Sequence, residues 1–405
     1  MTARSALSRV ATVASGLDPA LAVLAFIGFI SQVGISVMLP LLPLFASELG
    51  ATPFVLGLLT ASFAVTNAIG QLGTGFLVDR FGSRPFMSGG VGLYAAMNAL
   101  IATSSAAPWL IAWRSLAGFG GGAMIVSERI YVTEVTHPAR RAFANGIISA
   151  AQSAGTVTGP AVGGLAASIG GLRAPFVIVA ATSAIAFVGT LFLPRPKRVD
   201  RAARGDDIAV AEPVPYRSLA LLLAANLAIM ASYGAFITSY APMATERLGW
   251  STLEVGIAFS FLGAGSILLG PPLGHVADRY GRRPVAAWST LPIAAFSLSL
   301  VLGLPQAATF ALAVLAGAGL TGYNASWYAL LADVAGERRR GRTFGIVSGV
   351  SNAGIVVGAL AAAELWSRVD IAAAQVFAIV AVLAAGAAIV AFRPPHTGAD
   401  SAEAA

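Results

Sequence analysis

The chain has 405 residues, of which 57% are hydrophobic and only 11% are charged. Soluble domains carry charge on about a quarter of their residues, so a soluble globule of this size could not cover its surface with so few. The absence of cysteine excludes a disulfide-stabilised secreted scaffold, and the high apolar content excludes a disordered chain. The composition therefore indicates a polytopic membrane protein.

Apolar stretches of about 20 residues, long enough to cross a membrane as helices, recur along the whole sequence. The first six predicted spans cover residues 20–46, 54–78, 86–104, 109–132, 143–168 and 174–193. After a polar segment, six more cover residues 219–243, 253–277, 285–303, 307–332, 343–366 and 371–392. An even number of spans places both termini on the same side of the membrane.

Basic residues are distributed unevenly between the two sides. The side with the termini and the middle segment holds most of the 25 Lys and Arg residues, and the other side holds only Arg173, Arg247 and Arg368. Loops rich in Lys and Arg stay in the cytoplasm. We therefore expect both termini in the cytoplasm. Lys197 is the single lysine of the chain, and Arg and Ala are abundant. This composition is typical of GC-rich bacterial genomes, so we expect the membrane to be a bacterial inner membrane. The bases are then topology signals, and we expect no nucleic-acid partner.

The sequence repeats itself at an offset of 199 residues. Six of the eleven residues in 75–85 are identical in 274–284, and the same offset places Gly155 and Gly159 on Gly354 and Gly358. This repeat predicts two six-helix halves, residues 1–193 and 219–405, joined by a cytoplasmic linker at 194–218. Parallel repeats of this kind build transporters whose substrate binds near the membrane midplane between the halves.

Two loops carry the strongest motif, between predicted spans two and three and between spans eight and nine. The repeated residues are Gly75, Asp79, Arg80, Gly82 and Arg84 in the first copy and Gly274, Asp278, Arg279, Gly281 and Arg283 in the second. The pair resembles the signature loop of the major facilitator superfamily, except that Ser83 stands where a basic residue is usual. The resemblance covers the whole chain and implies an all-α membrane fold of twelve helices in two pseudo-symmetric bundles.

In the resembled family this loop acts as a gate on the cytoplasmic side. Glycine permits a tight turn, and the neighbouring Asp and Arg can form ion pairs that break when the halves move. By resemblance we expect Arg80 or Arg84 to reach Glu134, and Arg279 or Arg283 to reach Asp333. The alternative is that these loops are turns whose charges only set the topology.

A second motif lies in the fifth predicted span, at Gly155, Gly159, Pro160, Gly163 and Gly164. Glycines four residues apart leave a helix face on which another backbone can pack closely, and proline permits a kink. The pattern resembles the antiporter motif of drug/proton exchangers, which symporters of the superfamily generally lack. Plain helix packing is the alternative explanation.

The fourth predicted span contains a charge inside the apolar region, Arg114, which resembles the arginine that assists proton coupling in the family. Intramembrane charges are costly and usually face a cavity or a partner. Glu128, on the same helix face about 21 Å further along, is the deepest carboxylate of the sequence. Burial favours the protonated form of a carboxyl group, so we expect Glu128 to titrate during the cycle. Alternatively, Glu128 and Arg129 are helix-end charges that pair with loop groups.

Spans one, four, seven and ten line the cavity in the resembled family. Polar and aromatic residues at helical spacing in them are the candidate substrate contacts: Ser31, Gln32, Asn226, Tyr233, Asn324, Trp327 and Tyr328. Aromatic faces suit flat amphipathic ligands, although each ring could instead pack in the core. The first span carries no acidic residue, which argues against a cationic substrate.

No phosphate loop, zinc-ligand spacing or nucleophile motif occurs, so we expect no enzyme activity and no cofactor or metal. The sequence predicts a secondary transporter that exports small amphipathic compounds in exchange for protons. The alternative is a proton symporter or facilitator that imports a metabolite such as a sugar or organic acid. A membrane receptor would need a larger soluble region. One chain holds both halves, so we expect a functional monomer whose partners are its substrate, protons and the lipid bilayer.

Overall fold

The computed structural model describes residues 19–137, 140–195, 216–335 and 340–392, and helices make up nearly all of this part of the chain. The first half contains α2 (Pro19–Met38), α3 (Leu42–Glu48), α4 (Pro53–Phe81), α5 (Ser83–Thr103), α6 (Ala107–Val135), α7 (Arg141–Gly170) and α8 (Ala174–Leu191). The second half contains α9 (Tyr216–Pro242), η3 (Met243–Arg247), α10 (Thr252–Tyr280), α11 (Arg282–Trp288), α12 (Thr290–Leu302), α13 (Gln306–Ala335), α14 (Arg340–Arg368) and α15 (Ile371–Ala391). Most of the linker expected at residues 194–218 lies outside the described residues.

Eleven segments of the described chain are helical, long enough and apolar enough to cross a membrane. The remaining predicted span, residues 143–168, is the 30-residue helix α7. Glycine, serine and threonine are frequent in α7, and it packs along α2 and α10. Small residues replace large apolar ones in α7 because neighbouring backbones approach it closely.

The first predicted span is not one continuous helix. α2 ends at Met38, a turn contains Pro40, and α3 starts at Leu42 with Pro43 in its first turn. Proline has no N–H to donate within a helix, so Pro40 ends α2, whereas Pro43 is tolerated at a helix start. The prediction of an unbroken helix over 20–46 was wrong for this reason.

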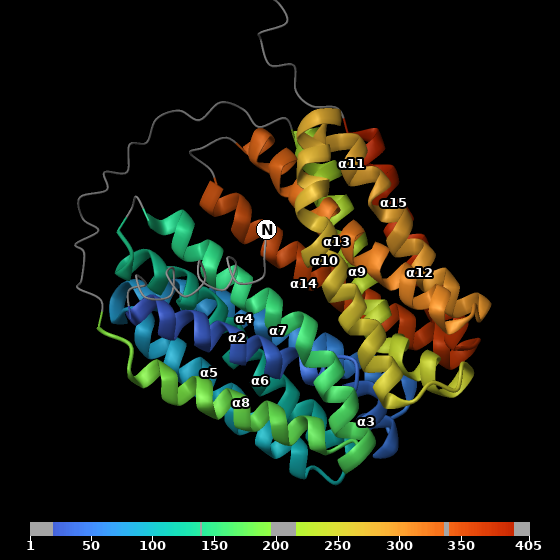
Figure 1. Cartoon of the computed structure of the whole chain (residues 1–405), viewed down its shortest axis with the longest axis horizontal. Helices are drawn as coiled ribbons and strands as arrows, with labels where there is room; N and C mark the ends of the chain where they lie inside the picture. Colours follow the sequence, from blue (N-terminus) through green and yellow to red (C-terminus); the bar gives the residue numbers. More distant parts are fainter. Residues whose placement is uncertain (1–18, 138–139, 196–215, 336–339, 393–405) are drawn as a thin grey trace, which may run out of the picture.

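The helices form two bundles that lie side by side (Figure 1). In the first bundle α2 packs against α7, and α4 packs against α6. In the second bundle α9 packs against α14, and α10 packs against α13. These pairs correspond to one another at the 199-residue offset, so the sequence repeat reappears as a repeated packing arrangement.

Two helix pairs make most of the contacts between the bundles, α4 with α14 and α7 with α10. A Cβ on Gly57 would lie 2.7 Å from the carbonyl oxygen of Ala359, and a Cβ on Gly256 would lie 2.3 Å from that of Pro160. Gly57 and Gly256 are equivalent in the repeat, as are Ala359 and Pro160. The interface between the halves therefore follows the same two-fold relation as the bundles, with glycine at each close approach.

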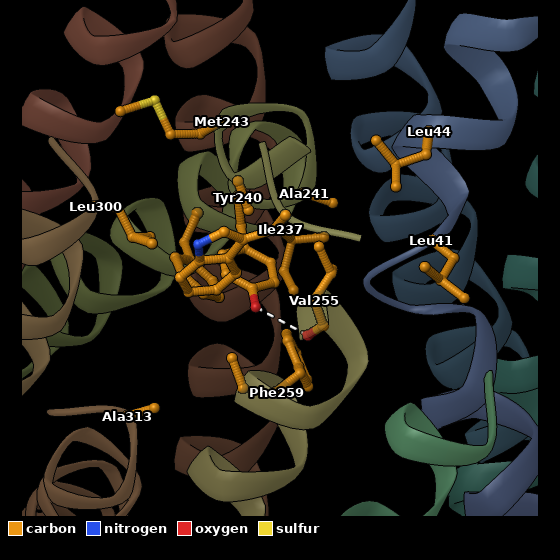
Figure 2. Packing of buried hydrophobic residues seen from close by; sticks show 14 of the residues in the cluster. Leu41, Leu44, Ile237, Tyr240, Ala241, Met243, Val255, Phe259, Leu300 and Ala313 are labelled. Carbon is orange, nitrogen blue, oxygen red and sulfur yellow. Dashed lines mark hydrogen bonds between the residues drawn. The ribbon is translucent and has the colours of Figure 1, made fainter. Parts of the chain in front are cut away.

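One end of the molecule is closed by apolar side chains from both bundles. Leu41 and Leu44 belong to the same buried cluster as Ile237, Tyr240 and Val255 of the second bundle. Figure 2 shows the two leucines opposite the residues of the second bundle, with the Tyr240 hydroxyl donating to the carbonyl oxygen of Val255 at 2.9 Å. We call this the sealed end, and the opposite end, which carries the turns at Gly82 and Gly281, the motif end.

Candidate functional site

A cavity of about 310 Å³ lies between the two bundles, on the inner side of the sealed end. Its walls come from α2, α3, α4, α5 and α6 of the first bundle and from α9 and α14 of the second. The lining residues used below are Gln32, Phe63, Asn67, Tyr94, Arg114, Tyr233 and Asn352. Most of the remaining lining is aliphatic, so the cavity is an apolar site with a few polar groups, as small-molecule sites usually are.

Arg114 is the charged residue of this cavity. Only 5% of its surface is exposed. Its guanidinium carbon lies 3.9 Å from the centre of the Phe63 ring, and its Nη1 lies 3.7 Å from the sulfur of Met38. Its Nε has no hydrogen-bond partner among the described residues. The charge is thus held by a ring face and a thioether, which are weak partners for a guanidinium.

Glycines on α6 bring the neighbouring wall of the cavity close to Arg114. A Cβ on Gly118 would lie 2.6 Å from the carbonyl oxygen of Phe63, and a Cβ on Gly122 would lie 2.2 Å from that of Asn67. Larger residues at these positions would push α4 away. The glycine-rich sequence after Arg114 therefore places Phe63 and Asn67 of α4 in the cavity wall.

A chain of hydrogen bonds runs from α6 to the second bundle. Asn67 donates from Nδ2 to the carbonyl oxygen of Gly118 at 3.2 Å, and Gln71 donates to Asn67 Oδ1 at 2.6 Å. Ser348 of α14 donates to Gln71 Oε1 at 2.7 Å. These bonds connect the wall beside Arg114 to the interface between the halves.

Glu128 lies outside the cavity lining. It is half-buried, and its Oε1 accepts a hydrogen bond from Gln152 Nε2 of α7 at 3.1 Å. A Cβ on Gly28 of α2 would lie 3.6 Å from the same oxygen. Glu128 thus lies where α2, α6 and α7 meet, nearer the motif end than Arg114.

Two of the seven predicted substrate contacts, Gln32 and Tyr233, line the cavity. The others do not. Ser31 and Asn226 are buried between helices, and Asn226 donates to Ser351 Oγ at 2.8 Å. The structure places Asn324 on α13 outside the lining, which contains no residue of that helix.

Trp327 and Tyr328 are also away from the cavity. The indole of Trp327 is fully buried and donates to the carbonyl oxygen of Leu222 at 3.0 Å, which fixes α13 against α9. The Tyr328 ring lies edge-on to Trp327 and is 47% exposed. A buried indole N–H needs an acceptor, and here the acceptor is a backbone carbonyl rather than a ligand.

The cavity lining also contains five polar or aromatic residues that were not predicted from the sequence: Thr60, Phe63, Asn67, Tyr94 and Asn352. They belong to the second, third and eleventh spans, which the resemblance did not include in the cavity. The signal that could have found the two asparagines is an amide side chain in the middle of an otherwise apolar span, since such groups face partners or cavities.

The repeated loops form tight turns at the motif end. Gly82 and Gly281 each connect two helices as single residues, with φ of 85° and 95°. These are left-handed conformations that glycine adopts without strain, which confirms the expected turns. By contrast, a Cβ on Gly75 would meet nothing within 4 Å. Gly274 lies within α10, and its surroundings and the side chain of Asp79 are outside the described part of the structure.

The position next to each turn glycine contacts an acidic residue of the neighbouring helix, Glu134 in the first half and Asp333 in the second. Ser83 Oγ donates to the carboxylate of Glu134, and Arg282 donates to both oxygens of Asp333 at 3.1 and 2.8 Å. Ser83 and Arg282 are equivalent in the repeat, so the position next to the turn glycine makes the contact in both halves. In the first half a hydroxyl therefore replaces a guanidinium.

Arg84 and Arg283 contact helix ends instead. Arg84 Nη2 donates to the carbonyl oxygen of Leu191 at 2.8 Å, and Arg283 Nε donates to that of Ile389 at 3.3 Å. The last carbonyls of a helix have no partner within it and carry partial negative charge, so they attract guanidinium groups. Arg80 and Arg279 lie over the rings of Phe81 and Tyr280.

The glycine motif of α7 uses two faces. Gly155, Gly159 and Gly163 face α2, and a Cβ on Gly163 would lie 2.2 Å from the carbonyl oxygen of Val37. Gly164 faces the other bundle, where its Cβ would lie 2.5 Å from the carbonyl oxygen of Thr252. α7 continues as a helix through Pro160, and the next N–H, of Ala161, donates to Ser260 Oγ of α10 at 2.9 Å. The motif thus joins α7 both to its own bundle and to the opposite one.

The sequence profile of the Major Facilitator Superfamily matches residues 24–243 and 221–405. The chain belongs to this superfamily. The match confirms the predicted fold class of twelve helices in two bundles and identifies a transport protein rather than an enzyme.

Curated relatives of the chain include drug-resistance proteins. The quinolone resistance protein NorA of Staphylococcus aureus (strain COL) is 23% identical over 377 residues, which cover 92% of this chain and 96% of NorA. The multidrug resistance protein 2 of Bacillus subtilis (strain 168) is 28% identical over 165 residues, 41% of each chain. The chain thus resembles drug/proton antiporters of the superfamily, as the sequence predicted.

Solved structures share the fold at low identity. A bacterial homologue of the human lysosomal transporter Spinster, in an inward-facing and occupied conformation, superposes with a TM-score of 0.72 at 18% identity, covering 93% of this chain and 97% of the homologue. The D-xylose–proton symporter superposes with a TM-score of 0.73 at 15% identity, covering 93% and 96%. The fold is therefore shared with these transporters at low sequence identity.

Proposed function

We propose that this transporter exports small amphipathic compounds from the cytoplasm in exchange for protons. The observation that carries the proposal is the packing of the Gly155–Gly164 segment, which joins the two halves through α7 and α10 in the pattern that resembles drug/proton exchangers. The similarity to NorA and to multidrug resistance protein 2, both named for drug resistance, supports export.

The orientation follows from the charges of the two ends. The motif end carries Arg80, Arg84, Arg279, Arg282 and Arg283. Because basic loops stay inside, the motif end faces the cytoplasm and the sealed end faces outward. In this orientation the cavity is closed to the outside, which is the arrangement in which an exporter takes up its substrate. The termini are then cytoplasmic, and a single chain suffices for the cycle.

Arg114 and Glu128 are the candidate groups for proton coupling. Glu128 is half-buried within α6 and has a neutral hydrogen-bond donor, Gln152, beside its carboxylate. A carboxyl in such a place can take up a proton without leaving an unpaired charge in the membrane. Arg114 lies in the cavity and would respond to the charge of whatever occupies it.

Import of a metabolite is the second candidate function. The likeness to the D-xylose–proton symporter favours it, as does the absence of Asp and Glu from α2. The two functions differ in direction, so a directional assay separates them.

The test is uptake of a panel of anionic, neutral and cationic amphipathic dyes into everted membrane vesicles that contain the protein. We expect accumulation of at least one dye when the lumen is acidic, and its loss when the gradient is collapsed or when Arg114→Ala is used. Vesicles without the protein are the control. Uptake only into right-side-out vesicles or whole cells would contradict export and indicate import.

A further inference from the structure

The central cavity contains a positive charge that has no negative partner among the residues that the structure describes. None of the residues that line the cavity is an Asp or Glu, and the nearest carboxylate along α6, Glu128, is 14 positions further on, about 21 Å along the helix axis. The ring of Phe63 and the sulfur of Met38 are the contacts of the guanidinium, and its Nε makes no hydrogen bond within the described part of the chain. A buried cation without a counter-ion is costly, so this site favours an incoming anion.

We infer that the transported compound carries a carboxylate or a similar anionic group on a flat apolar body, and that Arg114 binds that group. The inference rests on the proposed transport of a small molecule through this cavity. The planar guanidinium offers parallel N–H donors that match the two oxygens of a carboxylate. The unpaired Nε is one of these donors.

A second unused polar group lies beside Arg114. The Tyr94 hydroxyl is buried and close enough to interact with the charge of Arg114, but it makes no hydrogen bond of normal geometry with any described residue. Its O–H can donate to an anion held by the guanidinium. Tyr94 of α5 and Arg114 of α6, each with a buried polar atom that lacks a partner among the described residues, therefore line the same cavity.

The rest of the lining fits an apolar ring system. Phe63, Tyr94 and Tyr233 line the cavity together with aliphatic residues such as Ile237 and Ile355. Aromatic walls favour flat bodies by ring packing. The volume of about 310 Å³ is at the lower end for small-molecule sites and suits an aryl acid of one or two fused rings.

A cationic substrate is the form that this cavity disfavours. A cation would enter a low-dielectric site beside an uncompensated guanidinium, and like charges repel strongly there. A neutral compound gains no charge–charge attraction from Arg114. Among ligands with the same ring system, the order of affinity is therefore anion, neutral, cation.

The test measures binding to the purified protein in lipid nanodiscs by equilibrium dialysis, with empty nanodiscs as the blank. Three probes share one ring system and differ in charge: naphthaleneacetate, naphthaleneacetamide and naphthylethylammonium. We expect the carboxylate to bind about tenfold more tightly than the amide, as a charge-assisted contact predicts. The cation should bind most weakly of the three.

Variants assign the preference to Arg114. With Arg114→Gln the carboxylate should lose its advantage while the amide still binds, and Arg114→Lys should keep part of the advantage because the charge remains. The matched control Gln32→Ala, in the same cavity, should weaken all three probes alike and keep their order. Equal affinities for the three probes, a preference for the cation, or a carboxylate preference that survives Arg114→Gln would each overturn the inference. If Arg114→Gln does not fold, the wild-type order and Arg114→Lys still decide.

This binding test needs no proton gradient. A carboxylate preference in nanodiscs supports the inference even if everted vesicles accumulate nothing, which would count against export alone. Accumulation of cationic dyes together with equal affinities for the three probes would support export and overturn the inference.

Discussion

At the scale of single residues, two equivalent positions next to the turn glycines use different chemistry for the same contact. Ser83 is fully buried and donates to Glu134, whereas Arg282 is exposed and pairs with Asp333, which is 56% exposed. An exposed ion pair contributes about 0–1 kcal/mol, but a buried hydroxyl without an acceptor costs about 1–3 kcal/mol. The contact of Ser83 should therefore matter more to stability than the ion pair.

We expect Glu134→Ala to lower the thermal midpoint of the detergent-solubilised protein clearly more than Asp333→Ala. The physical reason is the buried hydroxyl of Ser83, which would lose its acceptor, while Arg282 can turn to water. The double variant Ser83→Ala/Glu134→Ala should recover part of the loss, since it removes the unsatisfied donor. Equal shifts of the thermal midpoint in the two single variants would show that the contact of Ser83 contributes no more to stability than the ion pair does.

Proton coupling is predicted to depend on the carboxyl group of Glu128. Glu128→Gln should lower gradient-driven accumulation of the substrate about tenfold or more, because an amide cannot carry the proton. Binding of the substrate to the cavity should persist. The amide oxygen can still accept from Gln152, so the helix contacts are retained. The control Glu364→Gln changes an exposed carboxylate at the sealed end, paired with Arg368, and should leave the gradient dependence intact. Unchanged gradient dependence in Glu128→Gln would remove Glu128 from the mechanism.

The sequence predicted some of these residues better than others. Arg114 could be predicted as a cavity residue because a charged side chain inside an apolar span usually faces a cavity or the interior of the bundle. Trp327 and Tyr328 could not be separated from cavity residues, because spacing on a helix does not say which neighbour covers that face. Ser83 was recognised as a departure from the family pattern, but its partner depended on the length of its side chain and on the turn at Gly82.

At the scale of helices, the close contacts of α7 decide how the two halves meet. Gly164 approaches α10 at the sealed end, whereas Gly146, on the same helix near the motif end, would meet nothing within 4 Å if it carried a Cβ. The two positions thus allow a side chain to be added to α7 with and without a steric clash.

Gly164→Val should separate α7 from α10 and loosen the sealed end. The chain has no cysteine, so a single Leu44→Cys reports the opening by its rate of reaction with a maleimide. We expect a several-fold faster reaction with Gly164→Val and no change with Gly146→Ala. The latter should even stabilise α7 by about 0.5–1 kcal/mol, because alanine is the better helix former and nothing clashes. A labelling rate insensitive to Gly164→Val would mean that this contact does not hold the end closed.

Helix positions were largely predictable, and helix breaks were not. Long apolar runs located the spans because a helix that crosses the membrane needs about 20 mostly apolar residues. The break after Met38 was missed because Pro40 lies within an apolar run, and a proline there can either kink or end a helix depending on the packing around it. The many small residues of α7 are likewise explained only by its close neighbours on both sides.

At the scale of the whole molecule, the two halves of the fold are related by the 199-residue repeat, but the residues of the cavity do not follow this relation. The contacts of Gly57 and Gly256 obey the two-fold relation. Arg114, in contrast, corresponds to Ala313, a buried residue of the second half. The repeat thus supplies two similar halves, and the single charge makes their shared cavity asymmetric.

Gln71 connects the two halves near the cavity through Asn67 and Ser348. Gln71→Leu should break both hydrogen bonds and lower the thermal midpoint, since Ser348 and Asn67 then lose a partner each. Ser367→Ala, which removes an exposed hydroxyl bonded only within its own helix, is the control and should have little effect. A midpoint unaltered by Gln71→Leu would show that this chain of bonds does not support the interface.

Exchange of substrate for protons is tested most directly with the purified protein in liposomes that contain a pH-sensitive dye. Substrate that accumulates in everted vesicles is added outside, with equal pH on both sides and protein-free liposomes as the control. We expect the lumen to become alkaline, because entering substrate drives protons out, and we expect Glu128→Gln to abolish this change. Acidification of the lumen beyond the control would mean that substrate and protons move together, which would contradict export by exchange.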